Sequence, residues 1–299
     1  MNKTIKSIKQ SVIRSYAPFV VGLAAVLPLS TASATLLFYE GFDYNTGQLT
    51  GKNGGEGDWA AWSGPNNPQV VEPGSTTTLP NGSTITAPNP MAFSNGDVAH
   101  EGGNRLVAGG PTDGGTPLNR VFDTALTGQD IWFSMLFAGT QGGQVYVGLL
   151  GSGAAGWQNH GFRFDGEGVK ASAGGNFSTA VGGNSISNVR LLVFNLVWDE
   201  AANNGNGGYG QTNLYVNPDT LTTPTSTTRS ISGNLKPTSV TRFQIHGATP
   251  NQNIAWDEIR IGTTYESVVI PEPAHMTLLA GIGLGLGVLM LRRRPRNTV

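Results

Sequence analysis

The chain of 299 residues contains no cysteine, and it carries 18 basic and 19 acidic residues. The missing cysteines exclude disulfides, a lipoprotein cleavage box and thiolate metal sites, so stability must come from a hydrophobic core. The charge is unevenly distributed, because residues 35–270 hold 10 basic and 18 acidic residues, a net charge of −8. This acidic segment repels nucleic acid and anionic lipid, so we expect no nucleic-acid partner.

The first segment, residues 1–34, has the three parts of a secretory signal peptide. A basic start is followed by an apolar run, Ala17–Leu29, and then by the small residues Ala32, Ser33 and Ala34. We therefore expect transport through the Sec translocon and cleavage by signal peptidase after Ala34. The alternative is a first transmembrane helix, but the apolar run is short for one and contains Pro18 and Pro28.

Residues 35–268 are expected to form one all-β domain. Short apolar or alternating segments recur between turns rich in glycine and asparagine, and no segment shows a helical period over a useful length. The expected strands are 36–39, 69–71, 105–108, 118–122, 131–137, 144–150, 161–164, 169–173, 189–198, 212–217, 240–246 and 254–262. Residues 73–90 should form a hairpin or an ordered loop, and 203–210 a flexible tip.

Two of these expected strands locate the core. In 131–137 and 189–198 both sets of alternate residues are largely apolar, so both faces of each strand should be buried. A strand that is buried on both faces belongs near the centre of a layered structure. Together with the regular spacing of strands and turns, this favours a two-sheet antiparallel sandwich or jelly roll.

Three short motifs resemble exported concanavalin A-like/laminin-G-like jelly rolls: F-Y-E-G-F-D-Y at 38–44, L-Y-V-N-P-D at 214–219 and W-D-E-I-R-I-G at 256–262. The resemblance implies that the first and last strands lie side by side; a different β-sandwich is the rival.

A structural calcium ion ties these two strands together in related jelly rolls, through carboxylates and backbone carbonyls. The matching residues would be Glu40 or Asp43 with Asp257. The alternative is that Glu40 pairs with an arginine such as Arg260 while Asp257 caps a turn.

The sequence contains no clear catalytic motif. A glycosidase needs two carboxylates about 5–9 Å apart, but Asp165 and Glu167 alternate with glycines, as in a turn. The adjacent pairs Asp199-Glu200 and Asp257-Glu258 would point to opposite sides of a strand. Polysaccharide lyases on this fold need a close Arg/His/Tyr set, and no motif assembles one. We therefore expect a non-enzymatic protein, with a secreted polysaccharide hydrolase or lyase as the alternative.

Tryptophans in expected loops are the candidates for glycan binding, because a sandwich binds sugars through exposed aromatic faces beside amides or carboxylates. Trp59, Trp62 and Trp157 lie among glycines in such loops. The alternative is that these side chains cover an edge of the sandwich.

The last segment, residues 269–299, begins with Pro271, Glu272 and Pro273, continues as an uncharged apolar run and ends in an arginine cluster. This cluster, at 292–296, comprises Arg292, Arg293, Arg294 and Arg296. We expect a transmembrane helix at 275–291, whose apolar residues 276–291 would measure about 24 Å. Such a helix is short for a stable span and suits a temporary anchor, with the arginines on the cytoplasmic side.

This order of tripeptide, apolar helix and arginines resembles the PEP-CTERM sorting signal of Gram-negative bacteria that make extracellular polysaccharide. The resemblance implies transient anchoring in the inner membrane and removal of the tail by exosortase, a membrane-embedded cysteine transpeptidase. An ordinary C-terminal membrane anchor is the alternative. The chain as a whole predicts an exported protein of the cell surface or extracellular matrix, with a structural or glycan-binding role in extracellular polysaccharide or biofilm. A ligand-free surface-coat protein is a third possibility.

Overall fold

The computed structural model describes residues 35–65, 67–100, 103, 106–109, 116–139, 144–151, 158–182, 185–224, 227–247 and 254–270. The expected signal peptide, Trp157, the Pro-Glu-Pro tripeptide, the transmembrane helix at 275–291 and the arginine cluster all lie outside these residues. Within the described residues, no helix has the length and apolarity needed to cross a membrane.

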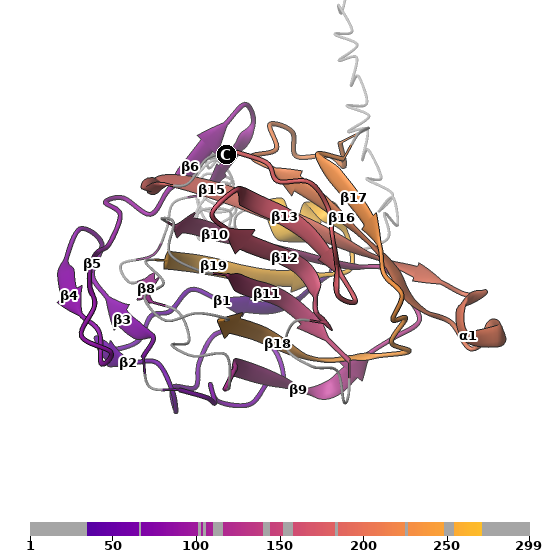
Figure 1. The fold of residues 1–299 in the computed structure, drawn as a ribbon, viewed down its shortest axis with the longest axis horizontal. Helices are drawn as coiled ribbons and strands as arrows, with labels where there is room; N and C mark the ends of the chain where they lie inside the picture. The colour runs from indigo at the N-terminus through magenta and orange to yellow at the C-terminus, as the bar shows by residue number, and fades with distance from the viewer. Residues whose placement is uncertain are drawn as a thin grey trace, which may run out of the picture. The chain divides into compact units, whose positions relative to one another are not determined.

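The described strands form two large antiparallel sheets (Figure 1), as the sequence predicts. Nine described strands make the larger sheet, in the order β17-β16-β15-β10-β19-β8-β3-β2, with β1 also paired to β19. These strands are β1 (Leu36–Glu40), β2 (Gly47–Gln48), β3 (Gln69–Val71), β8 (Leu106–Ala108), β10 (Ile131–Gly139), β15 (Ser185–Asp199), β16 (Gly208–Val216), β17 (Arg229–Ser232) and β19 (Ile254–Gly262). Glu40 lies opposite Ile259, so the first and last strands of the domain are neighbours, as expected.

Six described strands make the smaller sheet, in the order β14-β13-β12-β11-β18-β9. They are β9 (Leu118–Leu126), β11 (Val145–Leu150), β12 (His160–Asp165), β13 (Gly168–Ala173), β14 (Asn176–Phe177) and β18 (Val240–Gly247). Figure 1 shows β13, β12, β11, β18 and β9 side by side in this order. Each strand in this sheet runs antiparallel to its neighbours.

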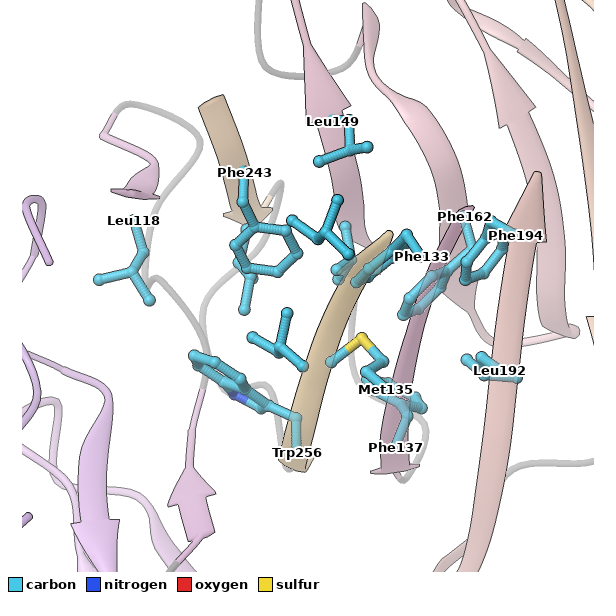
Figure 2. Close-up of a cluster of buried hydrophobic side chains, with 14 of the residues drawn as sticks. Leu118, Phe133, Met135, Phe137, Leu149, Phe162, Leu192, Phe194, Phe243 and Trp256 are labelled. Carbon is cyan, nitrogen blue, oxygen red and sulfur yellow. The ribbon is translucent and has the colours of Figure 1, made fainter. Parts of the chain in front are cut away.

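The main core fills the space between the two sheets (Figure 2). The larger sheet contributes Phe133, Met135, Phe137, Leu192, Phe194 and Trp256, and the smaller sheet contributes Leu118, Leu149, Phe162 and Phe243. Phe162 and Phe194 stack across the interface with ring centroids 5.3 Å apart. Because alternate strand residues point to opposite faces, this core uses only every second residue of β10 and β15.

The other residues of β10 and β15 are buried on the outer face of the larger sheet by a second, smaller core. This core contains Trp132, Leu136, Ala138, Leu191 and Val193, among others. Helix α2 (Tyr265–Val269), hairpin β4 (Thr76–Thr78)–β5 (Thr84–Thr86) and hairpin β6 (Phe93–Asn95)–β7 (Val98–His100) supply buried side chains to it or border it. The larger sheet is therefore a middle layer, which confirms the expectation that β10 and β15 are buried on both faces.

Helix α2 was not expected, because five residues are too few to show a helical period. Its N-terminus is fixed by a capping box, in which the Thr264 hydroxyl accepts from the Ser267 N–H and the Ser267 hydroxyl accepts from the Thr264 N–H. The expected tip at 203–210 also contains a single turn, α1 (Ala202–Gly205), whose Asn203 and Asn204 have positive φ. Such short elements are set by local capping and turn chemistry rather than by hydrophobic period.

Residues 42–64 close one edge of the sandwich, and both of their tryptophans belong to the core. Trp59 and Trp62 are only 5% and 1% exposed. Glycines let this loop approach the sheet closely: at Gly55, with φ of +74°, a Cβ would lie 2.2 Å from the Tyr39 carbonyl oxygen. The expectation of exposed glycan-binding faces on Trp59 and Trp62 is therefore wrong, and these side chains cover the sandwich edge instead.

Glu40 is also part of this closed edge and not a free metal ligand. Its carboxylate pairs with the buried guanidinium of Arg120, rather than with Arg260. The same carboxylate accepts from the Phe42 N–H at 2.9 Å, the Tyr44 hydroxyl at 2.6 Å and the Trp62 indole N–H at 3.2 Å. Because its oxygens already have these partners inside the core, the expected role of Glu40 in binding calcium is not supported by the geometry.

Candidate functional site

The outer face of the smaller sheet is the strongest candidate for a functional surface. Helix α2 and hairpin β6–β7 contact the outer face of the larger sheet, whereas outward side chains of the smaller sheet, such as Tyr146 and Phe177, pack against one another. The strands alternate in the same way as those of the larger sheet. Their inward residues, such as Val147, Phe162 and Ile245, join the main core, so the residues between them point outward.

A row of four ionisable side chains crosses this face. His246 on β18 pairs in register with Tyr146 on β11, Tyr146 pairs with Arg163 on β12, and Arg163 pairs with Lys170 on β13. Neighbouring strands lie about 4.8 Å apart, so directly opposed side chains are close enough to act on one ligand. We call His246, Tyr146, Arg163 and Lys170 the ionisable row.

Aromatic rings surround the arginine of the ionisable row. The Tyr146 ring lies 5.8 Å from the Phe177 ring and 5.9 Å from the His246 ring, centroid to centroid. The Arg163 guanidinium carbon lies 4.9 Å from the Phe177 centroid and 6.0 Å from the Tyr146 centroid, within the range of cation–π contacts. Stacking of this kind fixes the guanidinium plane, which prepares Arg163 for directional hydrogen bonds.

One buried carboxylate holds the cationic end of the row. Asp165 lies 2.7 Å from the Arg163 guanidinium and 3.0 Å from the Lys170 ammonium. Burial alone would raise the pKa of Asp165, but the Glu167 N–H, Lys170 and Arg163 together lower it below its ordinary value. Asp165 is therefore ionised at neutral pH and keeps both cations in place.

Beside the ionisable row runs a second row with a bare backbone at its centre. Gly148 and Gly161 oppose each other, flanked by Gln244 on one side and Ser172 on the other. A Cβ at Gly148 would lie 2.3 Å from the His160 carbonyl oxygen, and one at Gly161 would lie 2.3 Å from the Val147 carbonyl oxygen. Neither position accepts a side chain, because the backbone of the neighbouring strand lies too close.

Several polar atoms on this face have no hydrogen-bond partner within the described structure. They are Gln244 Oε1, His246 Nδ1 and Arg163 Nε. Gln244 is 2% exposed, and its amide nitrogen donates to Asn119 at 2.6 Å, which leaves its oxygen unpaired. Burial lowers the pKa of His246, so its imidazole is neutral at pH 7 and can accept a proton. All three atoms are buried, and a buried polar atom without a partner is costly.

The expected calcium residues do not form a ligand cluster. Asp257 is fully buried at a bulge of β19, where it accepts from the Gly103 N–H at 3.1 Å and the Glu258 N–H at 2.8 Å. Burial, followed by the charge of Glu258, raises the pKa of Asp257 well above its usual range. Asp43 is exposed, and within the described residues no group of three carboxylate or histidine side chains could hold a metal.

Two surface grooves lie elsewhere. One, of about 620 Å³, is lined partly by Asn89, Asn95, Asn188 and Asn217. The other, of about 470 Å³, lies beside β3 and β4. The asparagine groove has no ionisable side chain in its lining, so it offers hydrogen bonds but no acid–base chemistry. The outer face of the smaller sheet offers both.

The ionisable row was missed in the sequence because its members come from four strands. Each strand contains only a polar alternation: Tyr146 with Gly148, Arg163 with Asp165, Lys170 with Ser172, and Gln244 with His246. A search for two carboxylates on one strand does not find such a set. The available signal was the alternation itself, which predicts that these side chains share the face opposite the core.

Comparisons with known proteins assign no family to the chain. No family model matches it, and no curated protein does. Solved structures with some likeness include the metal-free carbohydrate recognition domain of Emp46p, the globular domain of T. cruzi calreticulin and lectin II from Ulex europaeus.

All three likenesses are distant. The Emp46p domain is 7% identical with a TM-score of 0.33, covering 53% of this chain and 82% of that domain. The calreticulin domain is 10% identical with a TM-score of 0.37, covering 86% of this chain and 100% of that domain. The Ulex lectin is 9% identical with a TM-score of 0.33, covering 58% of this chain and 92% of the lectin chain. At these TM-scores the likenesses decide neither family nor ligand, and the two-sheet description rests on the strand pairing.

Proposed function

We propose that the chain is an exported carbohydrate-binding protein with a concanavalin A-like sandwich, which binds extracellular polysaccharide through the outer face of its smaller sheet. The observation that supports this most is the ionisable row, in which Tyr146 and Arg163 lie against the aromatic ring of Phe177. Sugars present C–H groups to aromatic faces and hydroxyls to amides and guanidinium groups. This face supplies both kinds of partner.

The rest of the protein is consistent with a single binding face. The outer face of the larger sheet has large apolar side chains, but they are buried under α2 and the hairpins. The loop tryptophans Trp59 and Trp62 are core residues. The proposed binding face is thus the part of the described sandwich where aromatic and polar groups meet outside the core.

Binding is tested with the purified protein by electrophoresis through gels containing a neutral or a uronate polysaccharide. We expect retardation by at least one polymer, and about fivefold weaker binding for Phe177→Ala, since the loss of one stacking partner is worth about 1 kcal/mol. Val121→Ala is the matched control, because Val121 is an exposed apolar residue on β9 of the same sheet. Absence of binding to every polymer would contradict the proposal and favour a ligand-free surface-coat protein.

Export and sorting form the second part of the proposal, and they rest on the sequence of residues 1–34 and 269–299. We propose cleavage after Ala34, transient anchoring in the inner membrane and exosortase processing near Pro271–Pro273, followed by release to the cell surface or matrix. Mass spectrometry of the secreted protein measures both ends. Secreted material that still contains residues 275–299 would rule out the sorting step.

A further inference from the structure

Side chains from three different strands each form a hydrogen bond with the end of helix α2. The Ser134 hydroxyl on β10 donates to the Val268 carbonyl oxygen at 2.6 Å. The His100 Nε2 on β7 lies 2.9 Å from the Val269 carbonyl oxygen. Because a carbonyl oxygen only accepts, Nε2 carries the proton in this contact. Ser134 and His100 are 0% and 2% exposed, so both bonds lie inside the protein.

The third donor is a buried arginine that neighbouring side chains hold in place. A terminal nitrogen of Arg260 on β19 donates to the Ile270 carbonyl oxygen at 2.7 Å. Its other terminal nitrogen pairs with Glu258 at 2.9 Å, and the guanidinium carbon lies 5.1 Å from the Tyr39 ring centroid. Tyr39 also donates its hydroxyl proton to Glu258 at 2.8 Å. Since these contacts fix the guanidinium plane, Arg260 is positioned for a strong charge-assisted bond to Ile270.

The three bonds satisfy carbonyl groups that a helix cannot satisfy itself. The last carbonyls of an α-helix have no partner within the helix, and they commonly bond to water or belong to a glycine motif. At the end of α2, three successive carbonyls each receive a buried side chain instead. We call Ser134, His100 and Arg260 the carbonyl clamp.

Packing of the helix adds to the effect of the carbonyl clamp. Tyr265, Val268 and Val269 are fully buried and belong to the second core, on the outer face of the larger sheet. Gly262 lets the helix lie close to the end of β19, because a Cβ there would collide with the Ser267 hydroxyl oxygen. Helix α2 is therefore an integral part of the folded domain rather than the start of a linker.

Resting on the proposed export and sorting, we propose that the carbonyl clamp sets the boundary at which the C-terminal tail is removed, so that the processing enzyme cuts only beyond Ile270. A protease or transpeptidase reaches a bond inside a packed helix only when that helix unfolds locally. Cleavage transfers the acyl group of the retained domain to water or to an amine, and the tail leaves with a free amino group. Pro271, the first residue of the sorting tripeptide, directly follows the clamped Ile270.

The boundary also depends on folding. The members of the carbonyl clamp come from separate strands, so the carbonyl clamp exists only after the larger sheet and hairpin β6–β7 have formed. In a chain that has not folded, the bonds within α2 have no such protection. Cleavage there would remove the helix that covers the larger sheet, so correct removal of the tail requires a folded domain.

The experiment treats the purified full-length chain with an elastase-type protease, which cuts after small and branched apolar residues. Val268 and Val269 are such sites within the clamped helix, and a synthetic peptide of residues 260–275 serves as the unprotected reference. Mass spectrometry identifies the C-terminal residue of the retained domain at successive times. We expect cleavage after Val268 or Val269 to be at least about a hundredfold slower in the protein than in the peptide. The retained domain should end at Ile270 or beyond.

Matched variants separate the carbonyl clamp from overall stability. Ser134→Ala removes one donor and Arg260→Lys weakens another while keeping the charge, so the double variant should be cut inside α2 at least about tenfold faster than the parent protein. Ser172→Ala is the control, because Ser172 is also a fully buried serine but donates to Asn159 on the smaller sheet. It should lower the global free energy of unfolding without opening α2.

The outcomes distinguish this proposal from the sorting step on which it rests. Cleavage inside α2 of the parent protein as fast as in the peptide would reject the carbonyl clamp. Equal acceleration by Ser172→Ala would reject it too, because global unfolding would then control access to α2. A secreted protein that ends before Ile270 would contradict the boundary. Secreted protein that retains residues 275–299 would reject the sorting step, while slow cleavage by elastase would still establish the carbonyl clamp.

Discussion

The outer faces of the two sheets have the same strand alternation but opposite surroundings. On the larger sheet, Trp132 and Tyr215 lie under Tyr265 of α2, with ring centroids 5.4 Å and 6.0 Å from the Tyr265 ring. On the smaller sheet, the equivalent outward positions hold Tyr146 and Arg163, which pack against Phe177 of β14 in the same sheet. The comparison shows that the side chains on a sheet face determine what packs against that face. Apolar residues are covered by a helix and hairpins, while the mixed aromatic and ionisable residues pack against one another.

The test with the largest expected effect removes a side chain of α2 that covers the larger sheet. Tyr265→Ala deletes a fully buried ring that packs on Trp132 and Tyr215, and it should lower the free energy of unfolding by about 3–5 kcal/mol. Tyr265→Phe is the control, because it loses only the hydrogen bond to the Thr220 carbonyl and should cost about 1 kcal/mol. Urea unfolding measures both variants. A cost below 1 kcal/mol for Tyr265→Ala would show that α2 is not needed to cover this face.

The second test lowers the pH, because some histidines are buried inside the protein and another lies on the outer face of the smaller sheet. Burial lowers the pKa of His100 and of His160 to about 4, with the charge of Arg260 adding to the effect at His100. The unfolded chain then binds more protons than the folded one between pH 6.5 and about 4, so stability should fall as the pH falls through this window. Each of the two histidines should lower the free energy of unfolding by about 3 kcal/mol once the pH is below its pKa in the folded state.

Single variants identify the source of this acid sensitivity. His100→Gln and His160→Gln should each flatten the dependence of unfolding free energy on pH between 6.5 and 4. His246→Gln should change it less, because His246 lies half-buried on the outer face of the smaller sheet. An unchanged slope in both core variants would mean that other groups cause the acid sensitivity.

Local patterns in the sequence predict most strands, because the patterns depend on residues close together in the chain. The apolar runs at 131–137 and 189–198 correctly placed β10 and β15 in the middle layer, and the segment 254–262 coincides with β19. Helix α2 was not predicted, because its five residues are too few to show a helical period and its start is fixed by a capping box. The loop tryptophans were misassigned because glycines near Trp59 indicated a flexible exposed loop, whereas they allow the backbone to pack against β1.

The candidate site depends on strand register, which no local pattern contains. Tyr146, Arg163 and His246 are separated by 17 to 100 positions along the chain, yet they lie on three consecutive strands of one sheet. A shift of one residue in any of these pairings would turn a side chain toward the core. The alternation predicts the face on which each residue lies, and only the pairing of the strands shows that the three side chains are neighbours.

The smallest test concerns the two carboxylates at the cationic end of the ionisable row. Glu167 is 74% exposed and pairs with Lys170 at 2.5 Å, so Glu167→Gln should change the unfolding free energy by less than about 1 kcal/mol. Asp165→Asn should cost more, because Asp165 is 7% exposed and holds both Arg163 and Lys170. High salt should remove most of the Glu167 effect and little of the Asp165 effect, because buried pairs are less screened. Equal costs for the two variants would mean that Asp165 does not position Arg163, and the ionisable row would then be a solvated surface rather than a prepared site.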